Sequence, residues 1–151
     1  MCPQYSHSAL LPALSSIVGY GTFITHGYWK DKLHVQVCLV NDFIRIFPKG
    51  NWFPYILHCI KSSFWALKFD VSKEELNELD RYEGVHAGLF KRIQISVFLN
   101  DKRKLNAFIY IPTDETINTL NLNPNIDKID RWKEEIKKFP EVVKKFPELI
   151  L

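Results

Sequence analysis

The sequence has 151 residues, the usual size of one domain, and it is 46% hydrophobic and 14% aromatic, so it can bury a substantial core. The net charge of +3 is too small to argue for nucleic-acid binding. The three cysteines are scattered and odd in number, which argues against a disulfide framework or a zinc ribbon and makes a reducing cytoplasmic compartment the simplest expectation.

The first 15 residues are expected to form an N-terminal extension. Their short apolar patch has no basic segment before it and is far below the roughly 20 apolar residues that a membrane span needs. The sequence therefore predicts neither a targeting segment nor a membrane contact here.

A strand-rich domain is expected over residues 16–113. Alternating or β-branched runs predict strands in the segments IVGYGTF, HVQVCLV, FIRIF, YILHCI and SFWALKFDV. The segments FKRIQISVFL and LNAFIYI are expected to form a hairpin around the basic loop NDKRK, which is typical of a solvated turn.

One helix inside this domain has clear boundary signals. Ser72 followed by Glu75 is a capping box, and Val71 and Leu76 can close a hydrophobic staple around it. The helix continues through KEELNELDRYE and is expected to stop at Gly84, a favourable residue just past a helix end.

Residues 114–151 are expected to form a polar connector and a C-terminal helix and tail that pack on the domain. The segment IDKIDRWKEEIKKF predicts an amphipathic helix with an apolar stripe of Ile126, Ile129, Trp132, Ile136 and Phe139. Two prolines in the repeated KKFPE motif break a continuous helix, so two short turns are expected to follow. The apolar tail is compatible with a homodimer.

The carboxylate of Glu83 occupies an unexpected position at the end of the first helix. At helical spacing it falls between Leu76 and Leu79, so a helix that packs through these leucines turns Glu83 inward. Burial, the negative end of the helix dipole and the like charge of Asp80 should then all raise its pKa. A general acid or base needs such an environment. Periodicity alone leaves the alternative that the helix frays at Tyr82 and Glu83 faces water.

Other chemistry-bearing residues give weaker patterns. His34 and Cys38 share a strand face and His58 precedes Cys59, but neither pair has the spacing of a closed zinc site. A Cys–His nucleophilic pair lacks a third group that would orient it. No metal site is therefore expected.

Three segments together resemble the gamma-glutamylcyclotransferase-like family. VGYGTF resembles the family's opening strand and YGT-type loop, ELDRYEGVHAGLFKRIQISV its LDxxEG…YxR block, and AFIYI its final strand. The segment GNWFPYI stands where the family has a proline-containing segment near its pocket. The resemblance covers residues 17–112.

The resemblance implies an α+β fold, a small mixed β-barrel with flanking helices, to which this chain adds its C-terminal helical tail. It implies Glu83 as the catalytic acid/base. The matching substrate-binding residues would be Tyr20, Gly21, Thr22 and Phe23, and Tyr110 would be a further hydroxyl donor. The implied reaction cyclises a γ-glutamyl amine or amino acid to 5-oxoproline and releases the free amine. This reaction needs neither cofactor nor metal. Neither a membrane nor a nucleic acid is expected as a partner of the protein.

The chain departs from the family pattern at several positions. Phe23 and Ile24 follow the YGT-type loop, Phe64 and Trp65 replace a Gly-acid pair, and Phe90 stands where a tyrosine is usual. These changes make the pocket more apolar. They favour a second hypothesis, a non-catalytic domain of the same fold that binds a small ligand or protein, and a pocket plugged by aromatic side chains or by the N-terminal extension would support it.

Overall fold

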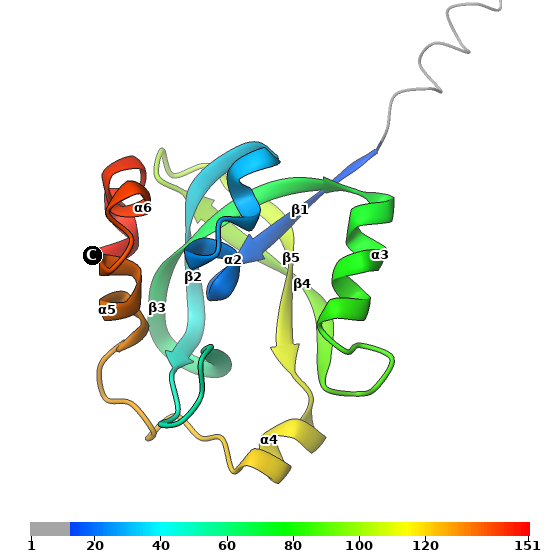
Figure 1. Ribbon diagram of the computed structural model, residues 1–151, viewed down its shortest axis with the longest axis vertical. Coiled ribbons are helices and arrows are strands. Elements are labelled where there is room, and N and C mark those ends of the chain that lie inside the picture. Colours follow the sequence, from blue (N-terminus) through cyan, green and yellow to red (C-terminus); the bar gives the residue numbers. More distant parts are fainter. Residues whose placement is uncertain (1–12) are drawn as a thin grey trace, which may run out of the picture.

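Five strands close into a β-barrel, and helices cover it on two sides (Figure 1). The computed structural model describes residues 13–151, so most of the predicted N-terminal extension lies outside the described residues. The strand order around the barrel is β1-β3-β2-β4-β5. This is the α+β mixed barrel that the resemblance implies.

Strand β1 (Leu14–Gly19) gives the barrel its mixed character. It pairs antiparallel with β3 and parallel with β5, where Ile17 lies opposite Phe108. The strand begins at Leu14, inside the segment 1–15 that was expected to be an extension, because Leu14 and Ser15 pair with Ser72 and Val71. Backbone pairing therefore extends the domain at its N-terminal edge.

Strands β2 (Leu33–Ile46) and β3 (Tyr55–Ser72) form one long antiparallel hairpin. The prediction of two shorter strands in each of these regions was wrong. Its breaks coincide with an irregularity in the pairing, where the register shifts between Asn41 and Phe43 and Asp42 has a positive φ of 64°. Such a bulge bends a strand without ending it, as a closing barrel requires.

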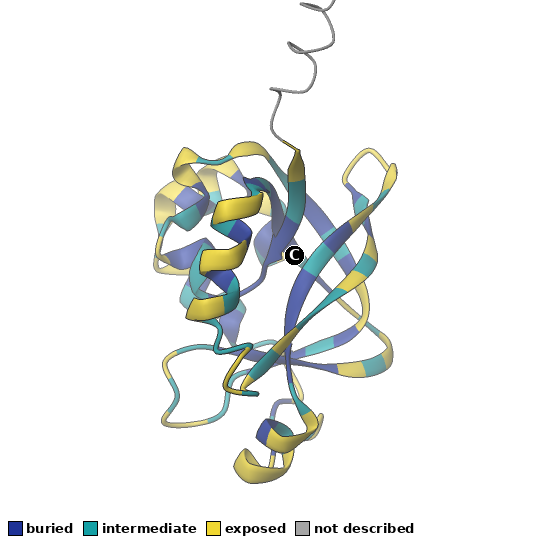
Figure 2. Ribbon diagram, turned by 90° about the vertical axis from the view of Figure 1, so that its right-hand side faces the viewer, coloured by how far each residue is buried: buried dark blue, intermediate teal, exposed yellow. Residues whose placement is uncertain are grey.

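The predicted hairpin at the end of the domain is confirmed as β4 (Phe90–Leu99) and β5 (Lys104–Pro112). Small and branched side chains from all five strands fill the barrel. The interior includes Val18, Cys38, Val40, Ala66, Val97, Ala107 and Ile109, each at most 2% exposed. Figure 2 shows the buried bands along the strands and the exposed residues of the hairpin tips.

Helix α3 (Lys73–Tyr82) follows β3 directly and confirms the predicted capping box. The Ser72 side chain accepts a hydrogen bond from the Glu75 N–H, and the Glu75 carboxylate accepts one from the Ser72 N–H. Leu76 and Leu79 are buried against Val71 of β3. The helix therefore has a fixed start and a fixed inward face.

The C-terminal segment begins below the barrel, and its last helices pack on the side of the barrel opposite α3 (Figure 1). It contains α4 (Asp114–Leu120), α5 (Trp132–Lys137), α6 (Pro140–Lys145) and the 3₁₀ turn η2 (Pro147–Ile150). The two turns of the KKFPE repeat are confirmed by α6 and η2. The prediction of one long amphipathic helix was wrong, because α5 has only six residues and Ile129 is 72% exposed. Among residues 13–151, no helix is both long enough and apolar enough to cross a membrane.

A buried ion pair attaches this segment to the barrel. The Arg45 side chain of β2 is fully buried and donates hydrogen bonds from Nε and Nη2 to the Asp130 carboxylate, the shortest at 2.6 Å. Nearby, Asp127 accepts hydrogen bonds from the Phe47 N–H and from Arg131. These two carboxylates hold the chain in a non-helical path just before α5, which explains the short helix.

Replacing Asp130 with alanine should destabilise the protein by about 3–5 kcal/mol, because the Arg45 charge then stays buried without its counter-ion. Urea unfolding of wild type and Asp130→Ala measures the loss. Asp101→Ala is the matched control, since it removes the exposed ion pair with Arg103 and should leave the unfolding midpoint nearly unchanged. Equal midpoints for Asp130→Ala and wild type would contradict this account of Arg45.

Candidate functional site

A cavity of about 330 Å³ opens between the end of β1, the C-terminal end of α3 and the β2–β3 connection. Its walls come from segments far apart in the chain. They are Val18, Tyr20, Gly21, Thr22, Phe23, Trp52, Phe53, Pro54, Tyr82, Glu83, Leu89, Phe90 and Tyr110. All six residues expected from the sequence line this one cavity: the acid, the four residues of the YGT-type loop, and Tyr110.

Glu83 caps the C-terminus of α3 and is mostly buried. Its backbone N–H still donates to the Leu79 carbonyl at 2.8 Å, so the helix does not fray before it. Among the described residues, its carboxylate has no hydrogen-bond or ion-pair partner, and burial raises its pKa from the ordinary 4.5 to about 7. The cavity therefore contains an acid that exchanges its proton near neutral pH.

Asp80 does not contribute to this pKa in the predicted way. Its carboxylate accepts a hydrogen bond of 2.6 Å from the Tyr110 hydroxyl and lies 3.2 Å from Nε of Arg92. Asp80 is thus engaged by Tyr110 and Arg92, and burial is the one cause that raises the pKa of Glu83. The bond to Asp80 also engages the Tyr110 hydroxyl proton, so Tyr110 offers the cavity its ring and hydroxyl oxygen rather than a free donor.

Both the hydroxyl and the backbone carbonyl of Tyr20 are hydrogen-bonded. Its hydroxyl donates to the Tyr110 carbonyl at 2.7 Å, and its own carbonyl accepts from Nη1 of Arg45 at 2.7 Å. Phe64 packs edge-on against its ring at 6.3 Å. Burial, followed by the nearby negative charge of Glu83, raises the pKa of Tyr20 well above its ordinary value, so the phenol stays protonated. Tyr20 thus anchors the start of the loop.

The loop turns at Gly21 because no larger residue fits there. A Cβ atom on Gly21 would lie 2.9 Å from the Pro54 ring of the β2–β3 connection. Gly21 starts the single-turn helix α2 (Thr22–Thr25), and its carbonyl accepts the N–H of Ile24. Among the described residues, no backbone carbonyl accepts the N–H of Gly21, Thr22 or Phe23. The turn therefore leaves polar hydrogens available at the cavity wall.

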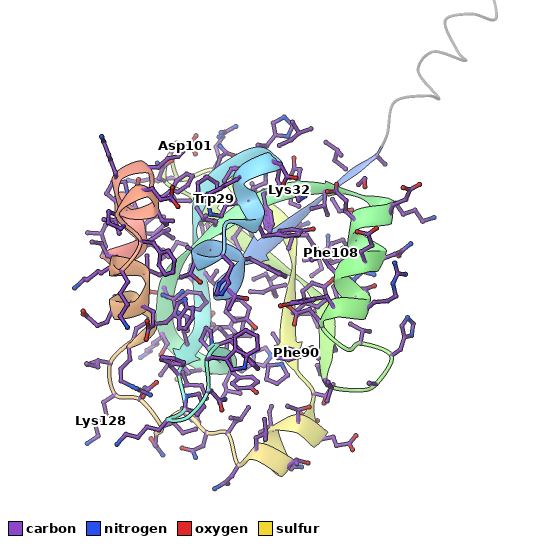
Figure 3. The ribbon with its side chains drawn as sticks, viewed as in Figure 1. Trp29, Lys32, Phe90, Asp101, Phe108 and Lys128 are labelled. Carbon is purple, nitrogen blue, oxygen red and sulfur yellow. The ribbon has the colours of Figure 1, made fainter. Side chains whose placement is uncertain are left out.

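The aromatic substitutions leave the cavity open. Phe90 stacks on Tyr55 at 5.8 Å between ring centroids and forms a wall (Figure 3). Phe64 is buried behind Tyr20, and Trp65 packs in the apolar cluster under the C-terminal segment, away from the cavity. A plug by Trp65 or Phe90, which would have supported the non-catalytic alternative, is absent from the described part of the chain. A plug by the N-terminal extension concerns residues outside it.

The lining residues missed as site candidates include Trp52, Phe53 and Pro54. They belong to the connection between β2 and β3, where strand periodicity has ended. The segment GNWFPYI did give a signal, because its proline stands where the family places one beside the pocket. No pattern of spacing could show which of its aromatic rings faces the site.

The weaker candidates lie apart from this cavity. Cys38 is fully buried in the barrel, and burial raises its pKa to about 12, so it stays a thiol. His34 pairs with Asp70 at 2.6 Å and does not contact Cys38. The basic loop is the tip of the β4–β5 hairpin, and Figure 3 shows its Asp101 far from Phe90. Over residues 13–151, no three potential ligand side chains are grouped to hold a metal ion.

The raised pKa of Glu83 should make the protein less stable as pH rises from about 4.5 to 7. The folded state holds this proton more tightly than the unfolded chain, so its contribution is present at acidic pH and is lost through the folded pKa. At about 1.4 kcal/mol per pH unit, the loss approaches 3 kcal/mol. The test is to measure the free energy of unfolding at pH 4.5 and at pH 8 for wild type and for Glu83→Gln. The loss of stability due to Glu83 is the difference between the pH dependences of the two proteins. Parallel pH profiles would contradict the raised pKa.

Comparison with known proteins agrees with this geometry. Residues 17–134 match the family model described as gamma-glutamyl cyclotransferase, AIG2-like. No curated protein gives a significant match.

Several solved structures share the fold. An Arabidopsis thaliana protein has a TM-score of 0.65 and 18% identity, over 89% of this chain and 82% of that one. A glutathione-specific γ-glutamyl cyclotransferase from yeast gives 0.57 and 12%, over 89% of both chains. A mouse AIG2-like protein gives 0.56 and 17%, over 77% of this chain and 88% of that one. The family match extends past Pro112, where the resemblance of the motifs ended, into the segment that holds Asp130. The chain belongs to the AIG2-like gamma-glutamyl cyclotransferase family.

Proposed function

We propose that this protein is a γ-glutamyl cyclotransferase that converts a γ-glutamyl compound to 5-oxoproline and a free amine or amino acid. The observation that carries the proposal is the position of Glu83. It is a mostly buried carboxylate with a pKa near 7, in a cavity that the Gly21 turn also lines, and the N–H groups of this turn have no backbone acceptor among the described residues. Family membership and the named neighbours support the same reaction class.

The chemistry requires little machinery because nucleophile and electrophile belong to one molecule. The substrate's α-ammonium gives a proton to Glu83, and the free amine attacks the γ-carbonyl carbon. The new C–N bond closes the five-membered ring. The bond to the leaving nitrogen then breaks as Glu83 returns the proton to that nitrogen. The ring nitrogen loses its second surplus proton to solvent, and the departing amine takes up one proton from solvent and leaves as an ammonium ion. Holding the chain in the reactive conformer supplies much of the rate acceleration.

A carboxylate with an ordinary pKa would be a poor base for this work. A pKa near the working pH lets the same group accept the proton and later give it back. Burial provides this property here without a second charge. The Glu83 environment thus suits a single residue that acts first as base and then as acid.

The Gly21 turn is the proposed binding site for the polar end of the substrate. Its free N–H groups suit the α-carboxylate or the negative oxygen that develops on the γ-carbonyl. The Thr22 hydroxyl, which has no intramolecular partner among the described residues, is a further donor. Tyr20, Phe23 and Tyr110 provide the walls that orient the γ-glutamyl chain.

Glu83→Gln should reduce 5-oxoproline release at least 100-fold, because the amide neither accepts nor returns the proton. A panel of γ-glutamyl amines and γ-glutamyl amino acids, assayed for 5-oxoproline, measures the rates. Glu74→Gln is the matched control, since Glu74 lies exposed on the same helix away from the cavity. Equal rates in wild type and Glu83→Gln would remove Glu83 from the mechanism. Binding of these compounds without turnover would favour the non-catalytic alternative, which the aromatic walls also suit.

The rate should depend on pH with a midpoint near 7. Only ionised Glu83 accepts the ammonium proton, so kcat/KM should rise with pH up to about 7 and fall about tenfold for each pH unit below it. Initial rates between pH 5 and 8.5 measure this limb. A midpoint near 4.5, the ordinary value for glutamate, would contradict a buried base.

A further inference from the structure

A second hollow of about 470 Å³ adjoins the cavity on the outer side of the Gly21 turn. Thr22, Phe23, Trp52 and Tyr82 line both spaces, so they form the boundary between them. Beyond this boundary the hollow is lined by other residues, among them Tyr28. A substrate whose γ-carbonyl lies near Glu83 has a leaving group that must extend past this boundary or into solvent.

The walls of this outer groove are aromatic and held in place. The rings of Phe23 and Tyr28 lie 5.0 Å apart, and those of Phe23 and Tyr82 lie 6.3 Å apart. Tyr28 also packs edge-on against Phe69 at 5.5 Å. On its other side, Nζ of Lys32 lies 4.4 Å from the Tyr28 ring centre. Pre-fixed rings bind a flat apolar group with little ordering cost.

The charges around the groove oppose an acidic occupant. Glu78 contributes a carboxylate and His26 an imidazole, and the lining holds no lysine or arginine among the described residues. Lys32, the nearest cation to Tyr28, is paired with Glu75 at 2.8 Å and Asp31 at 3.0 Å. An uncharged aromatic ring therefore matches the groove better than a carboxylate-bearing group.

We propose that the groove between Tyr28 and Tyr82 is the leaving-group subsite and that it selects γ-glutamyl compounds whose departing amine carries an aromatic ring. This inference rests on the proposed cyclotransferase reaction and does not change the bonds that form and break in it. The ring takes no part in the chemistry. It adds binding free energy next to the bond that breaks, which raises kcat/KM.

Two substrates that differ by one phenyl group test the subsite. γ-Glutamyl-phenethylamide should have a kcat/KM at least about 10-fold above that of γ-glutamyl-ethylamide, as expected for an apolar group added to a matching pocket. A γ-glutamyl amide of 1,5-diaminopentane is the charged competitor. Equal values for the phenethyl and ethyl compounds, or a preference for the charged one, would overturn the proposal.

Tyr28→Ala removes one wall of the groove without touching the inner cavity, so the ratio of the two kcat/KM values should fall to about 3 or below. Phe139→Ala is the matched control, because Phe139 is also half-buried and packs under the C-terminal segment, remote from the groove. The control should keep the wild-type ratio. A fall of the same size in both variants would assign the effect to general destabilisation and contradict the subsite.

Direct binding separates this inference from the reaction itself. Calorimetry with Glu83→Gln compares the affinities of the same two amides in a protein that should not turn them over. About 10-fold tighter binding of the phenethyl compound would support the groove even if wild type released no 5-oxoproline, an outcome that would contradict only the proposed function. Equal affinities would overturn the groove whether or not the enzyme is active.

Discussion

The buried guanidinium of Arg45 is the interaction on which both halves of the structure depend. A charge without solvent must be satisfied by partners of fixed geometry, and here these are the Asp130 carboxylate and the Tyr20 carbonyl. The first attaches the C-terminal segment to the barrel. The second fixes the residue that comes directly before the Gly21 turn. One side chain thus couples the packing of residues 130–151 to the position of the Gly21 turn.

Glu83 shows the opposite use of burial, because its carboxylate is left without a partner. The helix places the Glu83 carboxylate in the cavity. The neighbouring Asp80 instead accepts a hydrogen bond from Tyr110 and forms an ion pair with Arg92. Two acids separated by less than one turn therefore have different roles. Asp80 is paired and structural, and Glu83 is unpaired and able to exchange a proton near pH 7. Environment separates them, although both are acids on the same helix.

A site made of one acid and a glycine turn imposes few demands on the rest of the chain. Backbone N–H groups are present whatever the side chains are, and Glu83 gains its pKa from burial rather than from a specific partner. The fold is shared with solved neighbours at 12% and 18% identity. The side chains around the site are then free to change. In this protein they have become aromatic at Phe23 and Phe90.

Local signals in the sequence determined the parts of the protein whose information is local. The capping box fixed the start of α3, leucine spacing was compatible with an inward Glu83, and motif order indicated the barrel and six residues of the cavity. The structure alone decided what depends on contacts across the chain. The barrel bends β2 and β3 through bulges instead of ending them, and Asp130 shortens α5 because it pairs with Arg45 from 85 residues away. The partners of Asp80, Tyr110 and Arg92, come from β5 and β4, which no helical pattern includes. Side chains meet across a closed barrel according to register and burial, and periodicity along one segment carries no information about either.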